Sequence, residues 1–254
     1  MGAADGRRVA LVTGGTRGLG AAVATALAAA GWRLVVTARK APVDPDATDP
    51  PIAFIQADVR DAAAVAVLVS QVESRYGRLD LLVNNAGGAP AAPAAEASAR
   101  FHEAVIALNL TAPLLLSQAC YRLLAAAPGG GVIVNIASIS GVRPSPGTAA
   151  YGAAKAGLLS LTRSLAMEWA PWVRVNALVV GLAETEAALE HFGGAEGVAR
   201  VAASVPMGRM ARGEDIAAAI GFLASDAAAY VTGAEIALHG GGERPPFLEL
   251  AAQG

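Results

Sequence analysis

Short apolar runs alternate with longer helical patterns along the chain, and this alternation constrains the fold more than any other feature. The runs are of strand length and apolar at successive positions, so both of their faces must be covered. Strands are expected at residues 9–13, 34–37, 52–56, 81–84, 132–137, 173–178 and 235–238. Helices are expected at residues 19–30, 61–76, 101–126, 151–169 and 215–225. Such alternation predicts a parallel sheet with helices on both faces.

No composition shift, linker or internal repeat divides the 254 residues, so one domain spanning residues 1–254 is predicted. Its expected class is α/β, with a doubly wound, Rossmann-type parallel sheet of about seven strands. Four prolines within residues 41–51 predict a loop in place of a crossover helix. Residues 184–212 read as an irregular, amphipathic lid. Residues 243–254 form a tail that reaches a neighbouring subunit, covers the substrate or is disordered.

Composition excludes several classes of protein. A net charge of -2 leaves no basic surplus for nucleic acid. Cys120 is the only cysteine, so no disulfide or zinc knuckle can form, and a cytoplasmic location is expected. The apolar stretch 105–127 is interrupted by polar residues, which predicts a buried helix and no membrane span. The positive mean hydropathy predicts a large core or buried subunit contacts, and hence a homo-oligomer, either a dimer or a tetramer.

The sequence TGGTRGLG, from Thr13 to Gly20, connects the first expected strand to the first expected helix. Glycine lacks the Cβ atom that would hold a phosphate away from the backbone, and a helix N-terminus attracts anions. The turn is therefore interpreted as a pyrophosphate cradle; a tight turn without a ligand is the alternative. Its expected contacts are Gly14, Thr16, Arg17, Gly18, Leu19 and Gly20.

The second expected strand ends at Thr37-Ala38-Arg39-Lys40, where a dinucleotide fold contacts the adenine ribose. No carboxylate follows before Asp44, whereas Arg39 and Arg17 could clamp a 2'-phosphate. This predicts NADP(H) in preference to NAD(H); two solvated arginines are the alternative. Asp58, at the end of the third strand, is interpreted either as an acceptor for the adenine amino group or as a helix N-cap or first-turn acid.

Polar residues follow the fourth and fifth expected strands, at Asn84-Asn85-Ala86-Gly87 and at Ser138. Ligands bind at this carboxyl edge of a parallel sheet. Tyr151 and Lys155 are four residues apart, which places both on one face of a helix. The Lys155 ammonium could hydrogen-bond a ribose and lower the Tyr151 pKa from about 10 toward neutrality. Tyr151 would then protonate a carbonyl oxygen held by Ser138, and Asn109 would anchor a water linking Lys155 to solvent.

Lysine is rare in this chain, which makes Lys155 informative. Lys40 and Lys155 are the only lysines among 19 basic residues, so the position favours a compact ammonium. An ordinary amphipathic helix is the alternative for the Tyr151–Lys155 pair. The glycine turn, the NNAG run and Ser138 weigh against that alternative.

Together these motifs resemble the short-chain dehydrogenase/reductase family, from about residue 8 to residue 242. TGGTRGLG, NNAG, Asn109, Ser138 and YGAAK stand in the family's order and spacing. LNLTAP, YGAAKAGLLSLTRSLAMEWA and MGRMARGEDIA are most similar to its 3-oxoacyl-[acyl-carrier-protein] reductases, or ketoreductases. The resemblance implies hydride transfer between a nicotinamide and a carbonyl or alcohol, with Tyr151 as acid or base, Ser138 as polariser, Lys155 on the ribose and Asn109 in the proton relay.

The resemblance also implies a tetramer built on paired long helices. Cofactor contacts are implied or expected, beyond the turn and Arg39, at Asp58, Val59, Asn85, Ala86, Gly87, Tyr151, Lys155, Gly181 and Thr185. The chain departs from the family at Val180, where a proline usually precedes Gly181. His102, His191 and His239 lack metal-ligand spacing, so no metal is predicted.

The leading hypothesis is an NADPH-dependent reductase of a hydrophobic ketone or a 3-oxoacyl thioester. Apolar lid residues support it, although subunit packing would also explain them: Phe192, Val198, Val201, Val205, Met207 and Met210. An NAD(P)-dependent secondary-alcohol dehydrogenase would use the same catalytic residues. A non-catalytic nucleotide-binding sensor is the alternative from another class. Arg143, Arg209 and Arg212 form a basic patch for a carrier protein or merely solubilise the surface.

Overall fold

The computed structural model describes residues 6–41, 52–185, 188 and 192–243. Within these residues, seven parallel strands form one sheet in the order β3-β2-β1-β4-β5-β6-β7. The strands are β1 (Val9–Thr13), β2 (Arg33–Ala38), β3 (Ala53–Gln56), β4 (Leu81–Asn84), β5 (Gly131–Ser138), β6 (Val173–Val180) and β7 (Glu235–Leu238). The order reverses between β1 and β4, which confirms the predicted doubly wound sheet.

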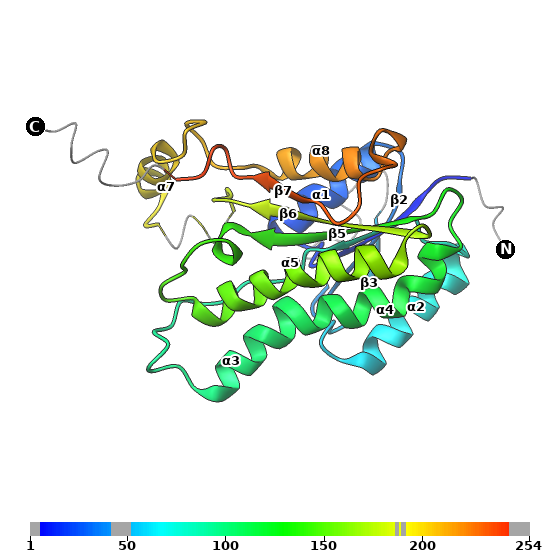
Figure 1. Cartoon of the computed structure of the whole chain (residues 1–254), viewed down its shortest axis with the longest axis horizontal. Coiled ribbons are helices and arrows are strands. Elements are labelled where there is room, and N and C mark those ends of the chain that lie inside the picture. The colour runs from blue at the N-terminus through cyan, green and yellow to red at the C-terminus, as the bar shows by residue number, and fades with distance from the viewer. Residues whose placement is uncertain (1–5, 42–51, 186–187, 189–191, 244–254) are drawn as a thin grey trace, which may run out of the picture.

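Helices cover both faces of the sheet (Figure 1). One face carries α1 (Gly18–Ala29) and α8 (Gly213–Leu223); the other carries α2 (Ala62–Tyr76), α4 (Ala112–Ala125) and α5 (Ala149–Trp169). Ala10 and Val12 of β1 join the core on the α1 side, whereas Val9 and Leu11 join the core on the α2 side. Successive residues of a strand point to opposite faces, which explains why the strand sequences are continuously apolar.

The expected helix 101–126 is divided into three parts. They are α3 (Ala99–Ile106), a π-helical turn (Ala107–Thr111) and α4. Ser98 caps α3 by accepting a hydrogen bond from the backbone N–H of Phe101 at 3.2 Å. By length and composition, the run 99–125 is apolar enough to cross a membrane, but α4 packs against β4, β5 and α2, as a core helix does.

Residues 184–212 contain more regular structure than the sequence predicts. α7 (Ala195–Ala203) lies within them, so an irregular conformation is wrong for this part. An isolated β-bridge joins Ala183 to Ala211 at the two ends of the segment. Residues 42–51 of the expected loop 41–51, His191, and residues 244–254 of the tail lie outside the described residues.

Candidate active site

The glycine-rich turn connects β1 to α1 as predicted. Gly14 and Gly18 have φ angles of +63° and +53°, a region that side chains disfavour. A Cβ on Gly20 would collide with the Gly14 carbonyl oxygen and with Nδ2 of Asn85. Arg17 makes no side-chain cap, and no acidic residue lies in the first turn of α1. The N-terminal N–H groups of α1 are therefore available for an anion such as a pyrophosphate.

Thr13 links two of the predicted motifs, and its spacing in the sequence does not reveal this. Its Oγ1 accepts hydrogen bonds from the backbone N–H groups of Asn85, at 2.9 Å, and Ala86, at 2.8 Å. In return, Asn85 Nδ2 donates to the Thr13 carbonyl oxygen at 2.8 Å. These bonds tie the NNAG run to the glycine turn. The detectable signal was a threonine at the end of an otherwise apolar strand.

The residues expected near the adenine are charged and partly exposed. Asp58 forms a two-point pair with Arg60, with Nε–Oδ1 at 3.0 Å and Nη2–Oδ2 at 2.6 Å. Its hydrogen bonds to Arg60 lower the Asp58 pKa to about 2. Asp61, and not Asp58, caps α2 by accepting from Ala63 and Ala64, so the N-cap alternative for Asp58 is wrong.

Arg17 and Arg39 are exposed, and neither forms an ion pair within the described part of the chain. The charge of Arg39 contributes to the lowered Asp58 pKa, which places the two residues near each other. The ion pair with the Asp58 carboxylate is formed by Arg60 and not by Arg39. Both arginines therefore remain able to bind an external anion.

Ser138, Tyr151 and Lys155 meet at the carboxyl end of β5. Ser138 ends β5, and Tyr151 lies in the first turn of α5. A hydrogen bond from Ser138 favours the tyrosinate, but burial has the larger effect and raises the Tyr151 pKa. The expectation that Lys155 brings this pKa toward neutrality is therefore not met by the geometry.

The Lys155 side chain is buried, with 3% of the residue exposed. Its Nζ donates to the Ile136 carbonyl oxygen at 2.7 Å and lies 5.6 Å from the Tyr151 ring centroid. Burial lowers the Lys155 pKa to about 8. The desolvated ammonium thus lies beside the phenol, as the sequence predicts.

Asn109 lies in the π-helical turn and faces Lys155 across Gly87. Its Oδ1 accepts from the Gly88 N–H at 2.9 Å, and its Nδ2 donates to the carbonyl oxygens of Gly88, at 3.0 Å, and Val105, at 2.9 Å. A Cβ on Gly87 would lie 2.7 Å from Asn109 Oδ1 and 3.2 Å from Lys155 Nζ. Glycine at this position leaves the space between the two polar groups open.

The remaining predicted contacts surround this centre. Val59 is buried just after β3, and Thr185 Oγ1 accepts from the Ala188 N–H at 3.1 Å. β6 continues to Val180, which pairs with Ser138 and Leu238, and the Gly181 N–H then donates to the Leu238 carbonyl oxygen at 3.0 Å. With valine in place of proline, the strand runs directly to the expected nicotinamide position.

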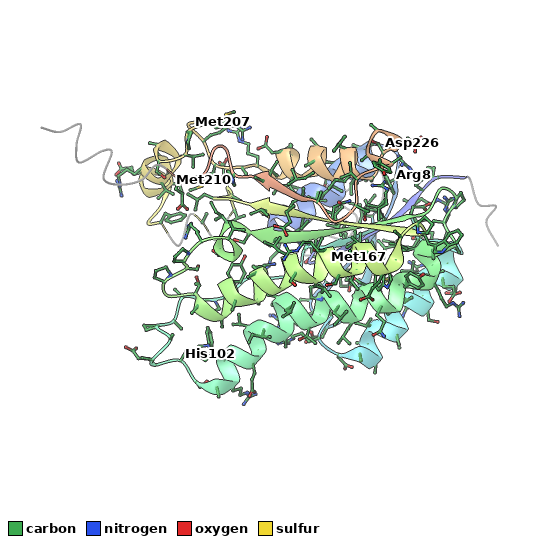
Figure 2. All side chains as sticks on the ribbon, viewed as in Figure 1. Arg8, His102, Met167, Met207, Met210 and Asp226 are labelled. Carbon is green, nitrogen blue, oxygen red and sulfur yellow. The ribbon has the colours of Figure 1, made fainter. Side chains whose placement is uncertain are left out.

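In the part of the chain that the structure describes, the other candidate groups are dispersed or paired with one another. No cluster of metal-ligating side chains is found in residues 6–41, 52–185 and 192–243. The three arginines of the hypothetical carrier patch are each paired with a carboxylate, in Arg143–Glu243, Arg209–Asp215 and Arg212–Glu184. The apolar residues of the lid differ in exposure: Val205 and Met210 are buried, whereas Met207 is 67% exposed. Figure 2 shows Met207 and Met210 near α7, at the carboxyl edge of the sheet.

Comparisons with known proteins agree with this geometry. The family model described as enoyl-(acyl carrier protein) reductase matches residues 14–243. The chain is 41% identical over 251 residues to a cis-4-hydroxycyclohexanecarboxylate dehydrogenase of Sinomonas cyclohexanicum, covering 95% of this chain and 98% of the relative. It is 37% identical over 243 residues to a 3-oxoacyl-[acyl-carrier-protein] reductase of Synechocystis, covering 92% and 96%.

A solved structure, the aldohexose dehydrogenase of Thermoplasma acidophilum, superposes with a TM-score of 0.86 at 25% identity. The alignment covers 92% of this chain and 93% of that one. The chain belongs to the short-chain dehydrogenase/reductase family. It is an oxidoreductase that acts on CH–OH or C=O groups with a nicotinamide cofactor.

Proposed function

We propose that this protein is an NADPH-dependent reductase of a hydrophobic ketone or a 3-oxoacyl thioester. The observation that carries the proposal is the convergence of Ser138, Tyr151 and Lys155 at the end of β5, beside the glycine turn. The apolar residues of the lid favour a hydrophobic substrate, and the pairing of Arg143, Arg209 and Arg212 with carboxylates argues against a basic docking patch for a carrier.

The choice of NADPH rests on the arginines at the adenine end. Arg17 and Arg39 are exposed and carry no ion pair within the described residues, while Asp58 is neutralised by Arg60. A guanidinium binds the dianionic 2'-phosphate of NADP(H) through paired hydrogen bonds. A carboxylate bound to the ribose hydroxyls would favour NAD(H) instead.

In the proposed reaction, bound NADPH supplies the hydride to the carbonyl carbon. Ser138 donates a hydrogen bond to the carbonyl oxygen, and Tyr151 transfers its phenolic proton to that oxygen. Lys155, whose Nζ lies 5.6 Å from the Tyr151 ring centroid, would bind the nicotinamide ribose, and the Ser138 hydrogen bond would stabilise the resulting phenolate. Asn109, held by Gly88 and Val105, anchors the water that returns a proton from solvent.

A secondary-alcohol dehydrogenase is the second candidate. The same residues perform the reaction in reverse, with Tyr151 taking the proton, and the relative at 41% identity is named a dehydrogenase of a hydroxycyclohexane carboxylate. A non-catalytic sensor is disfavoured, because Ser138, Tyr151 and Lys155 are all present. The helix α5, which carries Tyr151 and Lys155, packs against β5, which ends at Ser138, and Ser138 is hydrogen-bonded to Tyr151.

We also propose a cytoplasmic homo-oligomer, a dimer or tetramer. Large apolar side chains remain exposed on the helices that cover one face of the sheet: Ile106 of α3, Leu114 of α4 and Met167 of α5. Figure 2 shows Met167 on α5. Contact between copies would remove these side chains from water.

Initial rates test the function directly. NADPH and NADH oxidation are compared on an acetoacetyl thioester and a panel of bulky apolar ketones, with NADP+ and NAD+ reduction on the matching alcohols. Faster reduction with NADPH than with NADH supports the proposal. Turnover with NADH alone, or only in the oxidative direction at neutral pH with physiological cofactor ratios, contradicts it.

A further inference from the structure

Four buried polar side chains form one hydrogen-bonded chain below the carboxyl edge. Asn84 Nδ2 donates to Ser117 Oγ at 3.0 Å and to Asn135 Oδ1 at 2.8 Å. Asn135 Nδ2 donates to Thr162 Oγ1 at 2.9 Å, and Thr162 Oγ1 donates to the Leu158 carbonyl oxygen at 2.8 Å. Each of the four side chains belongs to a residue no more than 3% exposed. Burying them is costly unless all are hydrogen-bonded, and a fully bonded network specifies one arrangement of its elements.

The network joins the elements that carry the proposed catalytic groups. Asn84 and Asn135 face each other in register on β4 and β5. β5 continues from Asn135 to Ser138, and Thr162 belongs to α5, the helix of Tyr151 and Lys155. Ser117 belongs to α4, which continues without a break from the π-helical turn that contains Asn109.

Two attachments determine where α5 lies along β5. Lys155 Nζ donates to the Ile136 carbonyl oxygen at 2.7 Å, and Thr162 accepts from the neighbouring Asn135 at 2.9 Å. Thr162 is seven residues after Lys155, about two turns or 10 Å along the helix and on the same face. A rotation or slide of α5 by one residue would break both attachments.

Little space is left for such a movement. A Cβ on Gly157 of α5 would lie 2.9 Å from a methyl of Leu110 in the π-helical turn. A Cβ on Gly141 would lie 2.8 Å from the backbone carbon of Lys155. Small residues therefore bring α5 close to its neighbours, and the polar network selects the position that it takes there.

We propose that Thr162 and Ser117 are positioning residues for the reaction. They hold α5 and α4 at the register in which Lys155 Nζ and Asn109 Oδ1 face each other across Gly87. The inference rests on the roles that the proposed function gives to Lys155 and Asn109. All four network members are amides or hydroxyls. Their charge does not change with pH, so the hydrogen bonds that position the helices are independent of pH.

The kinetic test substitutes Thr162→Val, which keeps the shape of the side chain and leaves the Asn135 amide without its acceptor. We expect kcat to fall about tenfold with cofactor KM nearly unchanged, because misplacement affects the reacting geometry more than binding. Thr162→Ser restores the acceptor and should recover the activity. Ser164→Ala is the matched control, since Ser164 makes the same type of bond, to the Ser160 carbonyl oxygen at 3.1 Å, on the exposed face of α5.

A spectroscopic readout keeps this inference separate from the proposed function. The chain has only two lysines, so the ε-methylene signals of 13C-lysine-labelled protein report Lys155 directly, with exposed Lys40 as the internal reference. Burial alone holds the Lys155 pKa at about 8, and no charged side chain contributes to that shift in the described protein. Thr162→Val should move the midpoint upward as water reaches Nζ; Thr162→Ser should not.

Ser117→Ala provides a second variant if Thr162→Val does not fold. It frees α4 while Asn84, Asn135 and Thr162 remain bonded, and should lower kcat with a smaller change at Lys155. A folded Thr162→Val or Ser117→Ala protein with unaltered kcat and an unaltered Lys155 titration would overturn the proposal. If no carbonyl substrate is found, the lysine titrations still decide the positioning role, and only the proposed function fails.

Discussion

The two ends of the proposed cofactor site differ in burial and in the charge of their side chains. At the adenine end, Arg17 and Arg39 are exposed, and the Asp58–Arg60 pair is about one-third exposed. At the catalytic end, Lys155 is 3% exposed and its neighbours are neutral amides, hydroxyls and backbone carbonyls. Exposed charges contribute little to stability, whereas buried polar groups must be satisfied in one arrangement. Substitutions at the adenine end should therefore alter the cofactor preference without disturbing the fold. Substitutions among the buried polar groups at the catalytic end should disturb both the catalytic geometry and the packing.

Tyr151→Phe should produce the largest contrast between the two ends. It removes the transferable proton and leaves the shape of the ring, so turnover should fall by about three decades while NADPH affinity is kept. Steady-state rates and cofactor fluorescence titration measure the two effects. Tyr230→Phe, at a fully exposed tyrosine, is the control. Retained turnover would exclude Tyr151 as the proton donor.

The buried charge of Lys155 should appear in the pH dependence of stability. Its pKa is 10.5 in the unfolded chain and about 8 in the folded protein. Between these values the unfolded chain binds more protons, so the free energy of unfolding should rise with pH, by at most about 3 kcal/mol. Urea unfolding between pH 7.5 and 9 should show the rise in the wild type and in Lys40→Met; above pH 9 the raised pKa of the buried Cys120 thiol opposes it. Lys155→Met should lack it, and an equal rise in that variant would contradict the assignment.

Gly20→Ala tests the close contact that joins the glycine turn to the NNAG run. The added methyl collides with the Gly14 carbonyl oxygen and Asn85, so we expect about 2 kcal/mol of destabilisation and weaker cofactor binding. Gly221→Ala in α8 is the matched substitution, because nothing lies within 4 Å of its Cβ position. It should stabilise by about 0.5–1 kcal/mol. Equal effects in thermal unfolding would mean that the turn is not tightly packed.

Arg39→Ala should have the smallest effect on the fold and a selective effect on the cofactor. Loss of one charged contact to a 2'-phosphate costs about 1.5–3 kcal/mol, so the NADPH KM should rise tenfold or more. The NADH KM and the melting temperature should stay nearly constant, because Arg39 is exposed. Arg75→Ala, on α2, controls for loss of surface charge. Parallel changes in both cofactors would place Arg39 outside the 2'-phosphate site.

The sequence predicted the buried architecture well because burial leaves a clear pattern. Strands covered on both faces are continuously apolar, and the motif residues follow strand ends, so the sheet and the positions of Ser138 and Tyr151 could be inferred. The effect of valine in place of proline at position 180 is also simple: β6 extends to Val180, which pairs with Ser138 of β5.

Other features depend on contacts between distant segments, which local patterns do not show. The polar partners of Asn135 and Thr13 come from other strands and helices. The Asp58–Arg60 pair is local, since the two residues are two positions apart, but the hydrophobic pattern carries no signal for it. The π-helical turn is equally hidden, because Ala107–Thr111 reads as ordinary helix in hydrophobic periodicity.

That π-helical turn makes chain length important at one place in the molecule. Each residue of an α-helix advances the side-chain direction by about 100°, and a π-helical turn takes up about one residue more than an α-helical turn. The five residues Ala107–Thr111 therefore join α3 to α4 with nearly the rotation that four α-helical residues would give. If this turn became regular α-helix at unchanged length, α3 would rotate about its axis relative to α4 by about 100°, and the face with Phe101, His102 and Val105, which lines a small cavity with Tyr151, would turn away from it. Deleting one residue together with the π-helical turn would instead preserve that face, so the wall beside the phenol depends on chain length and helix type together.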